Sequence, residues 1–576
     1  MIFGTTALFA ALLPLTPLQE PVATPAQEAP KAMVPSASNS ASPVAPRAAS
    51  AAKVELPEIS AVEIDLETLA RALPADAVPA APISIPAASV RRQLVYQFGR
   101  AELESKKLDV FISAEMNAQL AAGIPPERFG VTQAEIDQAI ADTFRQVKEQ
   151  YPTLSEEDVL TSNGIDVANL PSLTRQSKLF DLVFLPDNPN EWPALTTEAL
   201  KASLTESFVT DLQAGYEERK ALEAEQTEEE RAQAKASRGM FDMLMRQQVR
   251  GALNGAASIE TASDGLPAEI AMRINGTDIL TEDVFERIAP RLTDSDIADA
   301  EMWLIKNALV EQTLRSKGAW LEGESWDDVW GAHVEENTGS LFPLEAVAMT
   351  FRGFPSMESY TQHYRLTASF ENMLADEIND ETLTAHVEQR AGHIINLTQV
   401  EPEIILISAF DFPKNRWIEG GWEAAAEEAL AVVDELVAAG GENWDELLEE
   451  HSDFWDPPAP TNPSAQQQPQ KLKNKGRFGQ RNRNEMLQMM GESDFSTYLR
   501  GSSIVDEIFF HMEQGEVDGP FLGKHGYYIV RVVRRVPPST RRGLEDENFK
   551  SMVRQDFVAD RLNQFADDLY QAATSS

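Results

Sequence analysis

The chain has 576 residues, carries a formal net charge of −43 and contains no cysteine. A chain of this length is too long for a single hydrophobic core, so we expect three or four folded units. The acidic excess argues against binding to nucleic acid. The lack of cysteine excludes disulfides, thiolate nucleophiles, Cys-ligated zinc and iron–sulfur clusters.

The N-terminal segment, residues 2–18, is apolar and nearly uncharged. Its length suits the core of a signal peptide, and Pro14 and Pro17 disfavour a stable membrane-spanning helix. We therefore expect residues 1–26 to be a signal peptide, and the protein to be exported to the periplasm or cell envelope. No Lys or Arg precedes the apolar run. Two alternatives are an uncleaved anchor, which would be the protein's only contact with a membrane, and an apolar start without function.

Residues 27–88 are rich in Ala, Pro, Ser and Val and poor in aromatic residues. This composition buries too little apolar surface to offset the entropy of ordering, so we predict a disordered tether with a transiently helical piece at 62–73. The rest of the chain is predicted to form a first helical module (89–195), a long charged helical connector (196–265), a second helical module (266–400), a domain that contains a sheet (401–537) and a C-terminal segment with one helix (538–576).

Local signals support the two helical modules. Thr132 and Glu135 form a capping box ahead of an apolar helical stripe. Further on, Asn275-Gly276 indicates the turn of a small hairpin, and Thr281 is placed to cap the next helix. This opening, Ile-Asn-Gly followed by Thr-Glu-Asp-Val, resembles the start of the helical domain in periplasmic parvulin-chaperones of the SurA and PrsA kind.

The segment Gly515–Val532 indicates two short strands joined by a turn at Gly523 and Gly526. Pro520 restricts the first strand to an edge or to a strand end. The segment resembles the end of parvulin-type peptidyl-prolyl isomerases, roughly Gly-Glu-Val-Ser-x-Pro-Val and then Gly-Tyr-His-Ile. A strand, two helices and a glycine-containing strand precede it in the family's order, so the resemblance covers about residues 401–537.

The resemblance implies a mostly α-helical α+β fold. Helical chaperone-like modules would accompany a C-terminal parvulin-like domain, in which helices surround a four-stranded antiparallel sheet. The C-terminal helix would pack against an earlier helical module. The family accelerates rotation about the X–Pro bond, whose barrier is about 20 kcal/mol because amide resonance must be broken. Such a catalyst holds the proline ring in an apolar slot, away from water.

The resemblance also assigns residues to the site. The slot for the proline ring would be lined by Phe478, Met486, Met490, Phe509 and Phe510. Ordinary core packing is the alternative interpretation of these five residues. The family's polar positions are occupied instead by Ile404, Phe454 and Tyr528. The Tyr528 hydroxyl can donate and accept a hydrogen bond but cannot reproduce an imidazole pair. Tyr528 and Ser452 remain as catalytic candidates, and His525 or His393 would match only under a different alignment.

The basic cluster in this acidic chain lies beside the predicted slot, and it comprises Lys471, Lys473, Lys475, Arg477, Arg481 and Arg483. It would either select acidic residues before proline or solubilise a loop. No phosphate loop, dinucleotide glycine pattern or zinc-protease motif occurs, and His386 and His393 lack a third ligand, so no metal or cofactor is expected.

The function that follows from the resemblance is that of a folding factor similar to peptidyl-prolyl isomerases. Its partners would be unfolded or proline-containing segments of exported proteins. Two alternatives remain open: a holdase with a catalytically inactive parvulin fold, and a scaffold that joins envelope partners.

Overall fold

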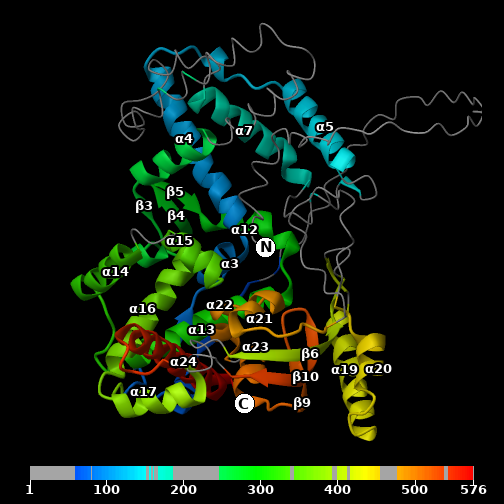
Figure 1. Ribbon diagram of the computed structural model, residues 1–576. Helices are drawn as coiled ribbons and strands as arrows, with labels where there is room; N and C mark the ends of the chain where they lie inside the picture. The colour runs from blue at the N-terminus through cyan, green and yellow to red at the C-terminus, as the bar shows by residue number, and fades with distance from the viewer. Residues whose placement is uncertain are drawn as a thin grey trace, which may run out of the picture. The chain divides into compact units, whose positions relative to one another are not determined.

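The computed structural model describes residues 59–79, 81–150, 167–185, 245–337, 343–391, 398–411, 416–418, 420–454, 476–501, 503–537 and 542–574, with a few isolated positions besides. These residues fall into two compact units (Figure 1). Unit 1 contains Ser105–Ser258 and Ala289–Arg291, whereas unit 2 contains Ile59–Glu104, Ile259–Ile288 and Leu292–Ser576. The predicted signal peptide, the first part of the predicted tether and nearly all of the connector before residue 245 lie outside the described residues.

Unit 1 is helical in its described part. Its main helices are α5 (Gln133–Gln150), α7 (Leu170–Phe184) and most of α4 (Arg100–Ala121), whose first residues belong to unit 2. The predicted capping box is confirmed. The Thr132 N–H donates to Glu135 Oε2 over 2.8 Å, and the Glu135 N–H donates to Thr132 Oγ1 over 3.3 Å. These two bonds satisfy donors that a helix N-terminus leaves free.

Unit 2 begins with a segment that was predicted to be disordered. This segment forms β1 (Val62–Ile64), α2 (Leu66–Ala72) and β2 (Ile83–Ile85), and the two strands pair antiparallel. Leu69 and Leu73 are buried in one apolar cluster with side chains from distant helices. The disorder prediction is therefore wrong for residues 59–79 and 81–86, although α2 falls within the piece 62–73 that was expected to be transiently helical. The few Leu and Ile residues of this Ala/Pro-rich segment find a partner surface only when those helices have folded, which composition does not reveal.

A small hairpin and a set of packed helices form the helical part of unit 2. The elements are α3 (Ala87–Phe98), β3 (Ile259–Glu260), β4 (Ile270–Ile274), β5 (Thr277–Leu280), α12 (Thr281–Ile288), α13 (Asp294–Ser316), α14 (Glu324–Asn337), α16 (Met357–Met373), α17 (Asp380–His386) and α24 (Glu547–Thr574). Asn275 and Gly276 have φ angles of 49° and 80°, so the predicted hairpin turn is confirmed. Thr281 starts α12, but its hydroxyl donates to the Ala268 carbonyl over 2.7 Å instead of capping the helix.

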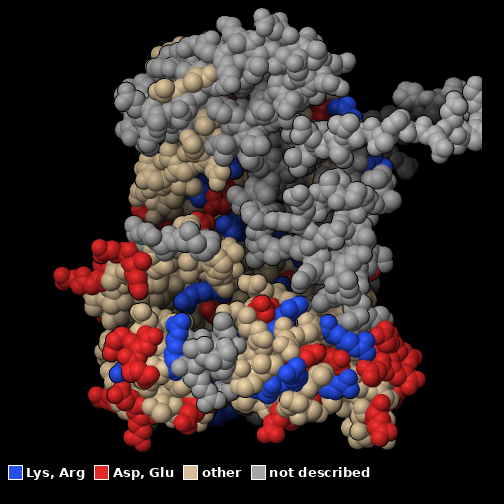
Figure 2. All heavy atoms as spheres, viewed as in Figure 1, with Lys and Arg blue, Asp and Glu red and all other residues tan. Residues whose placement is uncertain are grey.

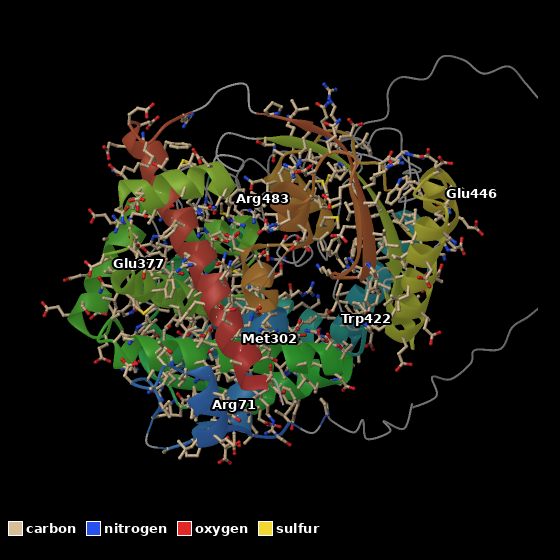
Figure 3. All side chains as sticks on the ribbon, turned by 90° about the horizontal axis from the view of Figure 1, so that it is seen from below. Arg71, Met302, Glu377, Trp422, Glu446 and Arg483 are labelled. Atoms are coloured by element: carbon tan, nitrogen blue, oxygen red, sulfur yellow. The ribbon has the colours of Figure 1, made fainter. Side chains whose placement is uncertain are left out.

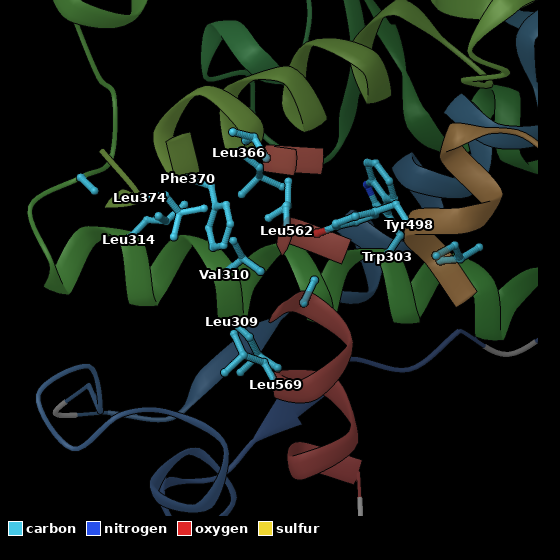
Figure 4. Close-up of a cluster of buried hydrophobic side chains, with 14 of the residues drawn as sticks. Trp303, Leu309, Val310, Leu314, Leu366, Phe370, Leu374, Tyr498, Leu562 and Leu569 are labelled. Carbon is cyan, nitrogen blue, oxygen red and sulfur yellow. The ribbon is translucent and has the colours of Figure 1, made fainter. Parts of the chain in front are cut away.

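The C-terminal helix α24 returns to the helical part of unit 2, as the resemblance implied. In Figure 4, Leu562 and Leu569 of α24 lie among side chains of α13 and α16. Lys306 of α13 is fully buried beside this contact. Its Nζ donates to the carbonyls of Tyr498 (3.2 Å) and Leu499 (2.9 Å) in α22 (Asp494–Arg500) and to Asp567 of α24 (3.0 Å). One ammonium group thereby joins three helices.

His363 of α16 makes the stability of this helical core sensitive to acid. Burial lowers its pKa to about 3, with a smaller effect of Arg352. Its ring packs 4.7 Å from that of Tyr498 and 5.1 Å from that of Phe354. The pKa of an unfolded His is about 6.5, so the unfolded chain takes up the proton first as the pH falls.

Above about pH 6.5 His363 is mostly neutral in both the folded and the unfolded chain, so its burial carries little pH-dependent cost. Between about pH 7 and pH 5 we expect the free energy of unfolding of this part of the chain to fall by about 2 kcal/mol. His363→Phe should remove that loss. The measurement is urea unfolding of both proteins at the two pH values, followed by hydrogen exchange of α16. An identical loss in the variant would show that other groups cause the acid sensitivity.

The sheet-containing part of unit 2 has one antiparallel sheet of order β6-β10-β9. Its strands are β6 (Gln399–Ser408), β10 (Gly526–Val536) and β9 (Val517–Leu522). Pro520 lies in the edge strand β9, as predicted. The expected fourth strand is shortened to two isolated bridges on the free edge of β6, Val400 with Arg481 and Glu403 with Arg477. Gly476 and Gly479 in this segment have φ angles of 72° and 66°, so the backbone departs from the extended conformation that a ladder needs.

Helices cover both faces of this sheet (Figure 1). One face packs against α19 (Gly421–Ala438) and α20 (Trp444–His451). The other face packs against α21 (Arg483–Met490), α23 (Ile504–Asp506) and the following turn η8 (Glu507–His511). The predicted class, α+β and mostly helical, is confirmed. Among the described residues, no helix combines the length and the apolarity needed to cross a bilayer.

Candidate functional site

The predicted slot residues are brought together by the fold. Phe478, Met486, Met490 and Phe509 belong to one apolar cluster on a single face of the sheet, and Phe510 packs against it. The residues that replace the family's polar positions, Ile404, Phe454 and Tyr528, lie in or against the same cluster. The residues that the resemblance assigns to one site therefore lie together in the structure. Substrate binding by these side chains stays a prediction.

The cluster is packed by its own side chains. Met486 and Phe509 are fully buried, and Tyr528 and Phe478 are 2% and 3% exposed. The ring of Phe454 meets that of Phe478 edge-on, with 5.0 Å between the centroids. Phe454 and Phe510, by contrast, are only partly buried against this cluster.

Tyr528 is the third residue of β10 and lies opposite Leu406 of β6. Burial raises the pKa of its hydroxyl above the ordinary value, although the His525 backbone amide opposes this effect. The hydroxyl is therefore neutral at any physiological pH. Gly523 permits its position, because a Cβ there would lie 2.3 Å from Cε2 of Tyr528. The ring fills space that a side chain at residue 523 would otherwise need.

Ser452 has a structural role at the end of α20. Its Oγ is 3.4 Å from the Leu406 N–H, from which it accepts, and 3.4 Å from the Ile404 carbonyl, to which it donates. Ser452 is itself buried. The hydroxyl thus links α20 to β6, and a catalytic role of Ser452 stays a prediction.

His525, which matched only under a different alignment, lies in the turn before β10. Its carbonyl accepts from the Ala409 N–H over 2.8 Å and from Ser408 Oγ over 3.1 Å. Its ring centroid is 5.4 Å from that of Phe410, at the end of the sheet. Burial lowers the pKa of His525 to about 4, so the ring is neutral at pH near 7.

Two arginines of the basic cluster, Arg477 and Arg483, form ion pairs within the protein. Arg477 pairs with Glu403 (3.3 Å), Asp445 (2.7 Å) and Glu449 (2.8 Å) on the outside of the sheet. Arg483 is buried between the sheet and α24 (Figure 3) and donates to Asp506 over 2.6 Å. Asp506 also accepts from Arg390 of the helical part over 3.2 Å. These pairs favour a structural role over recognition of acidic substrates. The three lysines of the cluster lie outside the described residues.

One surface was not predicted from the sequence. The helix α19 carries apolar residues on two faces, and only one of these faces packs on the sheet. The signal was present in the sequence, since apolar residues recur at helical spacing in two registers there. No group of three His, Asp or Glu residues that could hold a metal occurs in the part of the chain that the structure describes.

No protein-family model matches the chain, and no curated protein matches it. Solved structures of PrsA are similar to it. The peptidylprolyl isomerase PrsA of Bacillus anthracis shares 12% identity over 47% of this chain and 95% of its own, with a TM-score of 0.19. PrsA of Bacillus cereus shares 14% identity over 53% of this chain and 92% of its own, with a TM-score of 0.17. PrsA of Bacillus subtilis shares 14% identity over 52% of this chain and 90% of its own, with a TM-score of 0.16. The chain is thus similar to peptidylprolyl isomerases over about half of its length, at TM-scores that carry no conclusion about its activity.

Proposed function

We propose that the protein is a folding factor that binds unfolded polypeptide segments, and that its parvulin-like part is a non-catalytic scaffold. The observation that carries the proposal is the burial of Phe509 and Tyr528 in one packed apolar cluster. An isomerase stabilises the twisted imide more than the planar one, and it must enclose the proline ring to do so. Packed apolar or aromatic side chains occupy all three of the family's polar positions, and the neutral Tyr528 hydroxyl is the one polar group that remains at these positions.

The partners that we propose are unfolded segments of exported proteins, and the site of action is the periplasm or cell envelope. The apolar N-terminal segment supports export, and the strong negative charge disfavours nucleic acid as a partner.

The test combines two assays on the full chain. We expect the cis–trans exchange rate of a proline-containing peptide, followed by NMR, to equal the rate in buffer, while an active parvulin serves as the positive control. We also expect the chain to suppress aggregation of a chemically denatured protein. Catalysed exchange that is lost in Tyr528→Phe would contradict the non-catalytic assignment. Unchanged aggregation would contradict the folding-factor assignment.

A further inference from the structure

The second apolar face of α19 is exposed. Leu430 and Val437 are 57% and 75% exposed, and Val433 between them is partly buried. A helix turns once every 3.6 residues, so these three positions share one face. The buried face lies beside it and consists of Ala425, Ala429, Val432 and Leu436. No described element packs over Leu430 or Val437.

The edge strand β9 contributes a further exposed apolar side chain on the same side of the sheet. Leu522 is 61% exposed, and its pairing with Tyr527 places it on the side of the sheet that α19 covers. The Tyr527 ring lies 6.3 Å from the ring of Trp422 at the start of α19. Leu430, Val433 and Val437 together with Leu522 define what we call the α19–β9 surface.

Acidic side chains border the α19–β9 surface. Glu423, Glu427 and Asp434 are exposed and occupy the next sector around the helix, beyond Leu430. Figure 2 shows acidic side chains gathered at the edge of the molecule that α19 and α20 occupy. An apolar strip with an acidic border is complementary to a segment that carries apolar residues on one side and Lys or Arg on the flank.

We infer that the α19–β9 surface binds a basic amphipathic segment of a non-native polypeptide, and this inference rests on the proposed folding-factor function. It also places client binding on the face of the sheet opposite the filled cluster. Burial of the exposed Leu and Val side chains supplies the affinity, while the acidic border selects basic segments.

Two other occupants fit the surface less well. A second copy of the chain would bring the same row of carboxylates against the first, and like charges repel. Addition of a strand to β9 is hindered because Pro520 lacks an N–H and the pairing with β10 shifts register between Tyr528 and Val530. A partner that uses side-chain contacts, as a helix does, meets neither obstacle.

The test uses the full chain and two fluorescein-labelled peptides, one made of Leu and Lys at helical spacing and one of Leu and Glu in the same order. We expect fluorescence anisotropy to show binding of the basic peptide and at least about tenfold weaker binding of the acidic one. Leu430→Gln with Val437→Gln should weaken binding of the basic peptide at least about tenfold. Ala431→Gln with Ala438→Gln is the matched control on exposed positions of the same helix, and it should change affinity less than about twofold.

Equal affinity of the Leu430/Val437 variant and the parent chain would overturn the inference. Equal binding of both peptides would also overturn it. A dimer in sedimentation that this variant abolishes would overturn it too, because the surface would then bind a second copy of the chain.

The aggregation assay separates the surface inference from the proposed folding-factor function. If the variant suppresses aggregation as well as the parent, the folding-factor function stands and the surface assignment fails. If the parent chain does not suppress aggregation, the proposed function fails and peptide anisotropy alone decides the surface.

Discussion

Replacing Phe509 with alanine is expected to destabilise the sheet-containing part of unit 2 by about 4 kcal/mol. Phe509 is fully buried in the cluster that fills the predicted slot. Removal of its ring deletes apolar contacts and leaves a cavity that the packed neighbours cannot close. Hydrogen exchange of β6 and β10 is the suitable measurement, because a chain with two units need not unfold in a single step.

Phe510→Ala is the matched control in the same turn. Phe510 is only partly buried, and the Arg390 guanidinium lies 4.5 Å from its ring centroid. We expect this change to cost about 1–2 kcal/mol, because less apolar surface is lost. The opposite pattern, with Phe509→Ala stable but unable to bind proline-containing peptides, would mean that Phe509 lines a substrate slot.

Replacing Lys306 with alanine is expected to destabilise the helical part of unit 2 by about 3–5 kcal/mol. The buried ammonium donates to two carbonyls of α22 and to Asp567 of α24. Burial lowers the pKa of Lys306, while Asp567 acts in the opposite direction. Alanine would leave the carboxylate and both carbonyls without this donor, and unpaired buried polar groups are costly.

A double-mutant cycle separates the lost charge pair from the lost volume. Lys306→Met keeps the length of the side chain, and Asp567→Asn removes the partner charge. We expect the combined variant to be more stable than Lys306→Met alone by about 1 kcal/mol or more, since it leaves no unpaired carboxylate. The measurements are denaturant unfolding and hydrogen exchange of α13. If the stability losses of the two single variants add up to the loss of the combined variant, Lys306 and Asp567 do not stabilise each other.

Local sequence signals predicted most elements of the sheet-containing part. The run from Glu403 to Phe410 predicted the strand β6, because β-branched residues suit a buried strand. Gly440 and Gly441, both at positive φ, follow the predicted helix end near residue 438. Such signals act within a few residues, so a sequence can be interpreted at this level without knowledge of the distant chain.

Long-range contacts explain the failures. The segment 59–86 is ordered because α13 and α24 supply an apolar surface, although nothing near it in sequence does. The fourth strand is shortened at Gly476, where a Cβ would lie 1.9 Å from the Ile404 carbonyl. Only a glycine allows that approach, and the same backbone geometry limits pairing to two bridges.

By itself, the sequence determined the mostly helical α+β class, the order of the elements in the last part of the chain and the set of residues that meet on one face of the sheet. Only the tertiary structure decided how deeply these residues are buried and that α19 leaves Leu430 and Val437 exposed. Periodicity reveals which side chains prefer to be buried. Whether such side chains surround a cavity, fill it or remain on the surface depends on the volumes and directions of groups that come from distant parts of the chain.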